Sequence, residues 1–274
     1  MNKTQLHKYV NIVNQQFPNL TEEMIEKDYY LSLFLTLAEK LKKDTKLKEF
    51  GNLIFKGGTP LTKQYLNYHR ISEDLDFTYV NSIEIRKLST NKAIDKTIKV
   101  IQYNLIEDLK KICSSKFIFL NKKYPSLEYI NVRNKRVVCY FYLYYNSLYS
   151  SNKLSNIKIE INFVEKIIHK QNINKLLNIA NANNLELKSI DFDLKTVELM
   201  VYPINEIILE KYRAILTRKI VKERDFFDLY LIDKKYSGVL TTNNKLIKEK
   251  IESAFRFFPN TIRFYDDNLK QIKD

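Results

Sequence analysis

Asp74 and Asp76 are separated by one residue in the stretch "DLDFTYV", whose alternation of polar and apolar residues predicts a β-strand. Residues two apart in a strand project from the same face, so the two carboxylates are expected side by side. Two such charges repel each other unless a cation lies between them, and oxygen ligands of this kind suit Mg²⁺. The pair alone is a weak signal, because two acids on an exposed strand face produce the same pattern.

A glycine turn precedes the acidic strand. Gly57 and Gly58 are two of only four glycines in the chain, and Thr59 and Pro60 follow at once. Thr followed by Pro is a helix-start signal, with Thr59 as N-cap and Pro60 at the first helical position. Backbone N–H groups that face outward at such a turn suit a phosphate. We therefore expect a strand, a glycine turn and a helix that runs from Pro60 to about Tyr68.

A third carboxylate is expected on a later strand. In "IKIEINF" Glu160 lies on the polar side, and the other side is apolar, with Ile157, Ile159, Ile161 and Phe163. Three carboxylates and a phosphate-binding turn are the parts that two-metal nucleotidyl transfer requires. In that chemistry the metals activate an attacking hydroxyl and stabilise the pyrophosphate leaving group.

Lys211 falls in the middle of an apolar helical stripe, where a lysine is costly to bury. Either its ammonium reaches a phosphate, or the side chain snorkels and keeps its charge at the edge. Asp225 and Asp228 share one face of the next expected helix. Asp228 could orient Lys211 or Arg224, or be plainly solvated.

A sheet and several helices must position these residues. Helices are predicted over residues 21–43 and 91–113, and strands at "NLIF", "DLDFTYV", "RVVCYFYLYY", "IKIEINF" and "LKTVELMVY". From Pro203 onward the patterns are helical only, at 204–219, 223–235 and 243–255. The Asn-rich segment "NIANANNLELK" reads as a helix end or a loop. We predict an α/β (α+β) chain with a boundary at about Tyr202.

Composition narrows the class of protein. The 274 residues include 46 Lys and Arg against 32 Asp and Glu, a net charge of +14 that permits a polyanionic partner such as nucleic acid. Cys113 and Cys139 are too few for a disulfide framework or a zinc site, which favours a reducing compartment. Neither a signal core nor a membrane-spanning apolar run is evident, so we expect a cytoplasmic protein with no membrane partner.

The motifs in their order carry a family resemblance. "FKGGTPLTKQYLNYHRISEDLDF", "IEI" and "EKYRAILTRKIVKERDFFDLY" resemble the AbiEii-type abortive-infection nucleotidyltransferase toxins, a branch of the DNA polymerase beta-like nucleotidyltransferase superfamily. With the upstream "IEKDYYL", the resemblance spans residues 25–230. It implies a nucleotidyltransferase core with a mixed sheet flanked by helices, which we place at residues 1–202. A C-terminal helical region packed on that core follows at 203–274.

The resemblance also implies roles for individual residues. Nucleotide phosphates would be held by Gly57, Gly58 and Thr59, the metals by Asp74 and Asp76, and Glu160 would be the third carboxylate. Arg70 and Ser72 match the family's R-x-S-x-D-x-D run. Lys211 matches its lysine, and Asp225 matches the first aspartate of its R-D-x-x-D-L run. The resemblance implies nucleotide-binding or catalytic roles for these four residues. Pro60 departs from the small or aliphatic residue that the family usually has there.

We therefore expect an Mg²⁺-dependent nucleotidyltransferase, with two metals, that moves NMP from an NTP to an acceptor hydroxyl. The resemblance implies the toxin of a toxin–antitoxin pair, with a cognate antitoxin and with tRNA as acceptor for some members; the basic charge suits an RNA acceptor, with the tRNA 3′ end favoured. Transfer to a protein or small-molecule hydroxyl is one alternative. A catalytically silent module that binds RNA or a partner is another, although a silent site has no reason to keep Asp74, Asp76 and Lys211.

Overall fold

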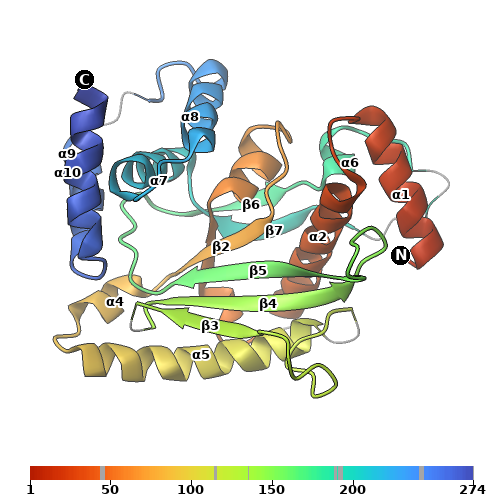
Figure 1. Cartoon of the computed structure of the whole chain (residues 1–274), viewed down its shortest axis with the longest axis horizontal. Helices are drawn as coiled ribbons and strands as arrows, with labels where there is room; N and C mark the ends of the chain where they lie inside the picture. The colour runs from red at the N-terminus through yellow and green to blue at the C-terminus, as the bar shows by residue number, and fades with distance from the viewer. Residues whose placement is uncertain are drawn as a thin grey trace.

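The structure is a computed structural model of the chain and describes residues 1–43, 47–113, 116–134, 136–187, 190, 194–240 and 244–273. A seven-stranded mixed sheet in the order β3-β4-β5-β2-β1-β7-β6 is flanked by helices (Figure 1). The strands are β1 (Leu53–Lys56), β2 (Asp74–Tyr79), β3 (Ile130–Arg133), β4 (Val138–Asn146), β5 (Leu154–Asn162), β6 (Asn172–Leu176) and β7 (Val197–Val201). The predicted mixed sheet with flanking helices is confirmed.

The helices lie before, between and after the strands. The longer ones are α1 (Lys3–Gln16), α2 (Glu22–Lys43), α5 (Asn91–Cys113), α7 (Ile204–Thr217), α8 (Glu223–Lys235), α9 (Asn244–Phe255) and α10 (Asn260–Lys273). Short helical pieces are η1 (Phe50–Asn52), α3 (Gly58–Pro60), the π-helical η2 (Leu61–Tyr65), α4 (Ser82–Lys87) and α6 (Ile179–Ala182). No helix in the described ranges has both the length and the apolar character needed to cross a membrane.

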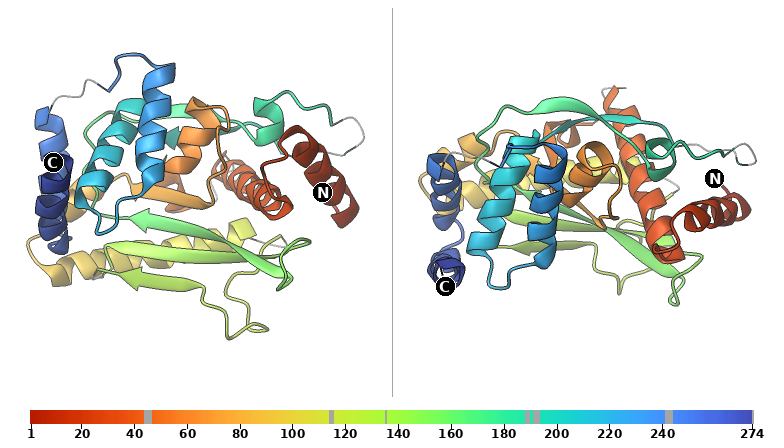
Figure 2. Two further views of the ribbon diagram at one scale, coloured as in Figure 1. Left: turned by 45° about the horizontal axis from the view of Figure 1, so that its top comes forward. Right: turned by 90° about the horizontal axis from the view of Figure 1, so that it is seen from above.

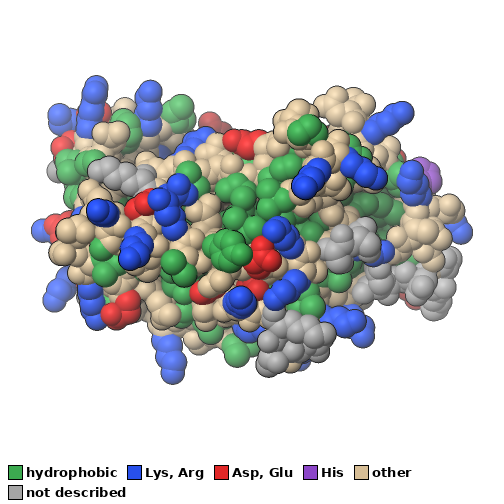
Figure 3. Space-filling view, turned by 90° about the horizontal axis from the view of Figure 1, so that it is seen from below, with side chains coloured by type: hydrophobic (Ala, Val, Ile, Leu, Met, Phe, Trp, Pro, Cys, Tyr) green, Lys and Arg blue, Asp and Glu red, His purple; other side chains and the backbone are tan. Residues whose placement is uncertain are grey.

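One face of the sheet is apolar and packs on α2 and α5. Alternate residues of the central strands, such as Phe55, Leu75, Phe77 and Ile159, are fully or almost fully buried in this core. Seen from the side of α5, Figure 3 shows Lys and Arg side chains spread over the surface among hydrophobic and acidic ones rather than gathered in one basic field. Because successive residues of a strand point to opposite faces of the sheet, the polar residues that alternate with these apolar ones face the other side.

The opposite face is covered in part by α7 and α8, which build a second, smaller core. Ile54 of β1 contributes to it with residues of α7 and α8, including Ile207, Ile208, Leu229 and Ile232. Figures 1 and 2 show α7 and α8 together above the sheet, on the side away from α5. Beside this second core lie the polar residues of β2 and β5, such as Asp74, Asp76 and Glu160, which are only partly buried.

Helices α9 and α10 pack on α7. The Asn268 amide Nδ2 donates to the carbonyls of Ile215, Leu216 and Arg218, at 2.9–3.2 Å, and so satisfies the C-terminal end of α7. The predicted helices at 204–219, 223–235 and 243–255 correspond to α7, α8 and α9. The division at residue 202 stays a prediction.

The start of the helix after the glycine turn was predicted wrongly. Gly57, and not Thr59, is the residue before the first helical turn, and Thr59 lies inside it. The helix also ends at Tyr65, because Asn67 and Tyr68 take positive φ angles of 47° and 57°. The "NIANANNLELK" segment contains the short helix α6, and its last residue lies outside the described residues.

Candidate active site

A polar cleft of about 400 Å³ is lined by residues of β1, β2 and β5 and of the helices α7 and α8. Its walls include every predicted site residue except Thr59, namely Gly57, Gly58, Arg70, Ser72, Asp74, Asp76, Glu160, Lys211 and Asp225. Residues up to 168 positions apart in the sequence thus meet in one place.

The glycine turn packs directly against the charged residues of the cleft. Gly57 has a φ of 83°, and a Cβ there would lie 2.5 Å from the carboxylate Oδ2 of Asp76. A Cβ on Gly58 would lie 2.7 Å from the guanidinium Nη2 of Arg70 and 3.0 Å from the hydroxyl of Ser72. Both positions therefore need glycine for close approach, and Gly57 also for its backbone conformation.

Thr59 is buried and does not face the cleft. Its hydroxyl Oγ1 donates to the carbonyl oxygen of Asp74 at 2.5 Å, so it fastens the turn to the first residue of β2. Thr59 can therefore act on a nucleotide through its backbone N–H or through the position of the turn. Its hydroxyl is already engaged.

Strand register brings the carboxylates together. Asp76 on β2 is paired with Lys56 on β1 and with Glu160 on β5, while Asp74 is paired with Lys158 on β5. Burial, followed by repulsion from Glu160, raises the pKa of Asp76 to about 7, although Lys56 and Lys158 oppose the shift. A crowded carboxylate of this kind is stabilised by an added cation.

The ligand atoms that the three carboxylates offer are of the type that a hard divalent cation such as Mg²⁺ prefers. Asp74, Asp76 and Glu160 offer oxygen atoms only, and a cation bound beside them would oppose the effect of burial and of Glu160 on the pKa of Asp76. Within the described residues, no three His, Cys, Asp or Glu side chains stand close enough to form a complete ligand set. Instead, the ammonium of Lys158 contacts Asp74 Oδ2 at 2.8 Å.

Lys211 is buried and ion-paired. Its Nζ donates to Asp225 Oδ1 at 2.7 Å and to Asp228 Oδ2 at 2.5 Å. The snorkelling alternative, with the ammonium free at the edge, is therefore not what the structure shows. Arg70 reaches the same Asp228 through Nε at 3.0 Å and Nη2 at 2.9 Å.

Asp228 is the fully buried centre of this cluster and orients Lys211 and Arg70, not Arg224. Burial raises the pKa of Asp228, but hydrogen bonds from His69 and Arg70 and the charge of Lys211 outweigh it and hold that pKa well below its usual range. Arg218 pairs with Asp225 in turn. The cluster joins α7, α8 and the segment before β2, and so fixes the distance between the helices and the carboxylates.

A second charged cluster lies beneath the cleft and was missed by sequence reasoning. Lys56 pairs with Glu165, and its Nζ lies 3.8 Å from Glu210. Burial lowers the pKa of Lys56, yet the two carboxylates raise it overall. Lys250 of α9, only 1% exposed, lies 2.7–3.2 Å from carboxylate oxygens of three glutamates, Glu165, Glu206 and Glu210.

Two of the cleft residues that sequence reasoning missed, Lys56 and Lys158, are basic. Lys158 stands two positions before Glu160 on the same strand face, so the alternation that indicated Glu160 also indicated Lys158. Lys56 follows the predicted "NLIF" strand directly. For the pairing of Lys56 with Glu165 and of Lys250 with three glutamates the sequence carries no local signal.

The sequence matches, over residues 41–273, a family model described as nucleotidyl transferase AbiEii toxin of a type IV toxin–antitoxin system. The chain belongs to this family. AbiEii membership makes it a nucleotidyltransferase toxin that uses an NTP, and the type IV classification implies a cognate antitoxin. The AbiEii match begins after the "IEKDYYL" segment and continues through α10, whereas the motifs had suggested residues 25–230.

Solved structures support the AbiEii fold. MenT4, a nucleotidyltransferase toxin from Mycobacterium tuberculosis H37Rv, superposes with a TM-score of 0.55 at 18% identity, over 90% of this chain and 71% of that one. An antigenic nucleotidyltransferase-like protein from Paracoccidioides brasiliensis gives a TM-score of 0.36 at 13% identity, over 88% and 92% of the two chains, and carries no argument. Comparison with curated proteins gave no match.

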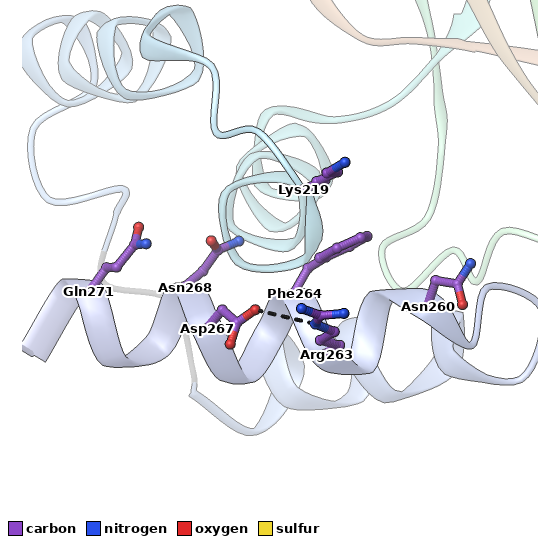
Figure 4. Close-up of a pocket in the computed structure, with 7 residues that line it drawn as sticks. All are labelled: Lys219, Asn260, Arg263, Phe264, Asp267, Asn268 and Gln271. Carbon is purple, nitrogen blue, oxygen red and sulfur yellow. Dashed lines mark ion pairs between the residues drawn. The ribbon is translucent and has the colours of Figure 1, made fainter.

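A larger hollow of about 600 Å³ lies beside the end of α7, against α10, and lacks the chemistry expected of an AbiEii active site (Figure 4). Its one carboxylate, Asp267, lies 3.9 Å from Arg263 on an exposed helix surface. Asn268 in its wall caps α7 instead of facing a ligand. The smaller polar cleft is therefore the candidate active site.

Proposed function

We propose that this AbiEii toxin transfers a nucleoside monophosphate from an NTP to a hydroxyl of RNA, with the tRNA 3′ end as acceptor. One observation carries the proposal. Asp74, Asp76 and Glu160 share a cleft with a bare glycine turn and with the ion-paired Lys211. Carboxylates for metals and backbone N–H groups for phosphates are the parts that nucleotidyl transfer requires.

Asp74 and Asp76 are the residues that would hold Mg²⁺, with Glu160 as the third carboxylate. When bound, the ions would lower the pKa of the attacking hydroxyl and stabilise the pyrophosphate leaving group. The strand register that brings Asp76 beside Glu160 supports this assignment, because a bound cation would offset the repulsion between the two carboxylates.

The turn and the cluster around Asp228 supply the remaining functions. In this proposal the backbone N–H groups of Gly57 and Gly58 would bind the triphosphate, and Arg70 and Ser72 lie close to Gly58. Lys211 would offset the charge that develops on the phosphates, and Asp225 would hold the lysine in position. Because Asp225 and Asp228 fix Lys211, its charge is preorganised before the nucleotide arrives.

An RNA acceptor is supported by the charge of the chain and by the cleft wall. The net charge is +14, and Arg70, Arg213 and Arg218 line the cleft. Each of the three is already held by a carboxylate, Asp228, Glu210 and Asp225 respectively. Lys222 and Arg224 line the cleft as well and add positive charge at its edge.

The test is incubation of the toxin with each labelled NTP and total RNA, followed by separation of labelled RNA from labelled protein. We expect label on tRNA, a steep loss of tRNA labelling with added salt, and a smaller loss of NTP binding. Asp74→Ala and Asp76→Ala should abolish transfer with the fold retained, and the same assay with EDTA should abolish it in the wild type. Label found on protein and never on RNA would replace this proposal with the protein-modifying alternative.

A further inference from the structure

Helix α8 carries three exposed aromatic side chains on one turn. Phe226, Phe227 and Tyr230, which we call the α8 aromatic face, are 49%, 50% and 60% exposed. A single exposed aromatic is ordinary, but three together leave an apolar surface uncovered. The other side of α8 packs into the core through Leu229 and Ile232, so folding does not need the α8 aromatic face.

The α8 aromatic face begins at the mouth of the cleft. Arg224 and Asp225, which directly precede Phe226 in the same helix, line the cleft. The ring of Phe227 lies 6.3 Å from the ring of His69, the residue before the cleft-lining Arg70. An extended ligand that leaves the cleft alongside Arg224 would therefore contact Phe227 next.

Two exposed cations at this mouth have no ionic partner. Lys222 and Arg224 form no ion pair with any residue that the structure describes, whereas Arg70, Lys211 and Arg218 are all held by carboxylates. Repulsion from Arg224, then partial burial and Arg218, lowers the pKa of Lys222. An anion placed between these side chains would relieve that repulsion.

From this arrangement we propose that the α8 aromatic face stacks the unpaired bases of a single-stranded RNA acceptor end, whose phosphates lie at Lys222 and Arg224. The inference rests on the proposed function, because it assigns a binding surface to the RNA acceptor. Binding of single strands combines a basic track for the phosphates with aromatic rings for the bases, and stacking tolerates any base sequence. Bases in a duplex are already stacked on each other, so the surface selects an unpaired end.

The probe is an RNA hairpin whose single-stranded 3′ tail contains 2-aminopurine, a base whose fluorescence falls on stacking. We expect the wild type to quench the tail and to bind it more tightly than the same hairpin with a blunt end. Phe227→Ala with Tyr230→Ala should weaken tail binding by about tenfold or more and abolish the quenching, since two stacking rings are lost. Phe227→Trp, which keeps a ring, should retain both.

A matched control comes from the opposite side of the molecule. Tyr103 on α5 is 65% exposed, and Tyr103→Ala should leave tail affinity and quenching unchanged. Equal affinity and equal quenching in the wild type and in the double alanine variant would overturn the inference. So would a double variant that loses binding of the cognate antitoxin while RNA binding is unchanged, because the face would then belong to a protein.

Failure of the proposed function and failure of the stacking surface would give different experimental results. This binding assay needs neither NTP nor transfer, so it reports on the α8 aromatic face by itself. If the wild-type toxin labels RNA and the alanine variants bind RNA normally, only the proposed stacking surface is contradicted. Wild-type toxin that labels protein and never RNA defeats the proposed acceptor.

Discussion

Lys158 lies opposite Asp74 on the neighbouring parallel strand, with its ammonium 2.8 Å from Asp74 Oδ2. Burial lowers the pKa of Lys158, but Asp74 and then Asp76 raise it overall. This lysine supplies positive charge at the carboxylates that we assign to metal binding. It therefore competes for Asp74 with any cation that enters the cleft.

Lys158→Met should tighten Mn²⁺ binding in the absence of nucleotide by about tenfold, because one resident positive charge next to Asp74 is removed. Titration of free Mn²⁺ by electron paramagnetic resonance measures this directly. Lys158→Arg keeps the charge and should bind Mn²⁺ like the wild type. Lys92→Met removes an exposed lysine of α5 and should also leave Mn²⁺ binding unchanged. An unchanged Mn²⁺ affinity in Lys158→Met would refute the competition.

Asp76 should make the protein less stable as the pH rises. Its folded pKa of about 7 lies above the ordinary carboxyl value of about 4 in the unfolded chain, so the folded state binds the extra proton between these values. That stabilisation is fully present below about pH 4 and is lost as the pH passes 7. Asp76→Asn has no such proton to lose.

In EDTA, Asp76→Asn should therefore melt above the wild type at pH 8, by on the order of 3 °C, and near the wild type at pH 4. Thermal unfolding followed by circular dichroism at both values makes the comparison. Added Mg²⁺ should raise the Tm of the wild type at pH 8 and leave that of Asp76→Asn unchanged. Parallel pH profiles for the two proteins would contradict the raised pKa.

Long, periodic elements could be predicted from the sequence. Helices α5 and α8 begin and end as expected, because their apolar residues recur at helical spacing between clear end signals. The edge strands β3 and β6 were not predicted, since "INVR" and "NINKL" are short and mostly unburied. Helix α1 and helix α10 were not predicted either, and α10 is an amphipathic helix with few apolar residues.

The site could be predicted only where its signal is local. The D-x-D spacing and the glycine pair placed Asp76 and Gly57 in one cleft, and this is where the structure has them. That Asp76 lies between Lys56 and Glu160 depends on the register of β2 with both β1 and β5, which no local pattern encodes. Similarly, the three glutamates around Lys250 meet only after α9 has packed on α7.

Gly57→Ala should reduce transfer by about 100-fold or more, because the added Cβ would lie 2.5 Å from the Asp76 carboxylate and move it. Gly238 is the matched control, since its φ of 78° is just as unfavourable for alanine but no atom lies within 4 Å of the added Cβ. Gly238→Ala should thus lower the Tm to a similar extent and keep the transfer rate. Equal rates for the two variants would show that the approach of Gly57 to Asp76 has no role in transfer.

Lys211→Met tests whether the buried lysine serves chemistry or only the fold. The structure gives Lys211 two buried carboxylate partners, Asp225 and Asp228, so the change removes two ion pairs. Asp225 retains Arg218 and Asp228 retains Arg70 after the change, so we expect a loss of about 1–3 kcal/mol in the free energy of unfolding, less than for an orphaned buried charge.

Transfer by Lys211→Met should fall by about 100-fold or more even at temperatures where the variant is fully folded, since the charge that faces the triphosphate is gone. Tm and transfer rate are measured on the same preparations. Lys219→Met provides the control, because Lys219 is exposed just beyond α7 and lines only the larger hollow beside α10. If Lys211→Met is less stable but transfers at the wild-type rate, then Lys211 only stabilises the packing of α7 against α8 and has no role in transfer.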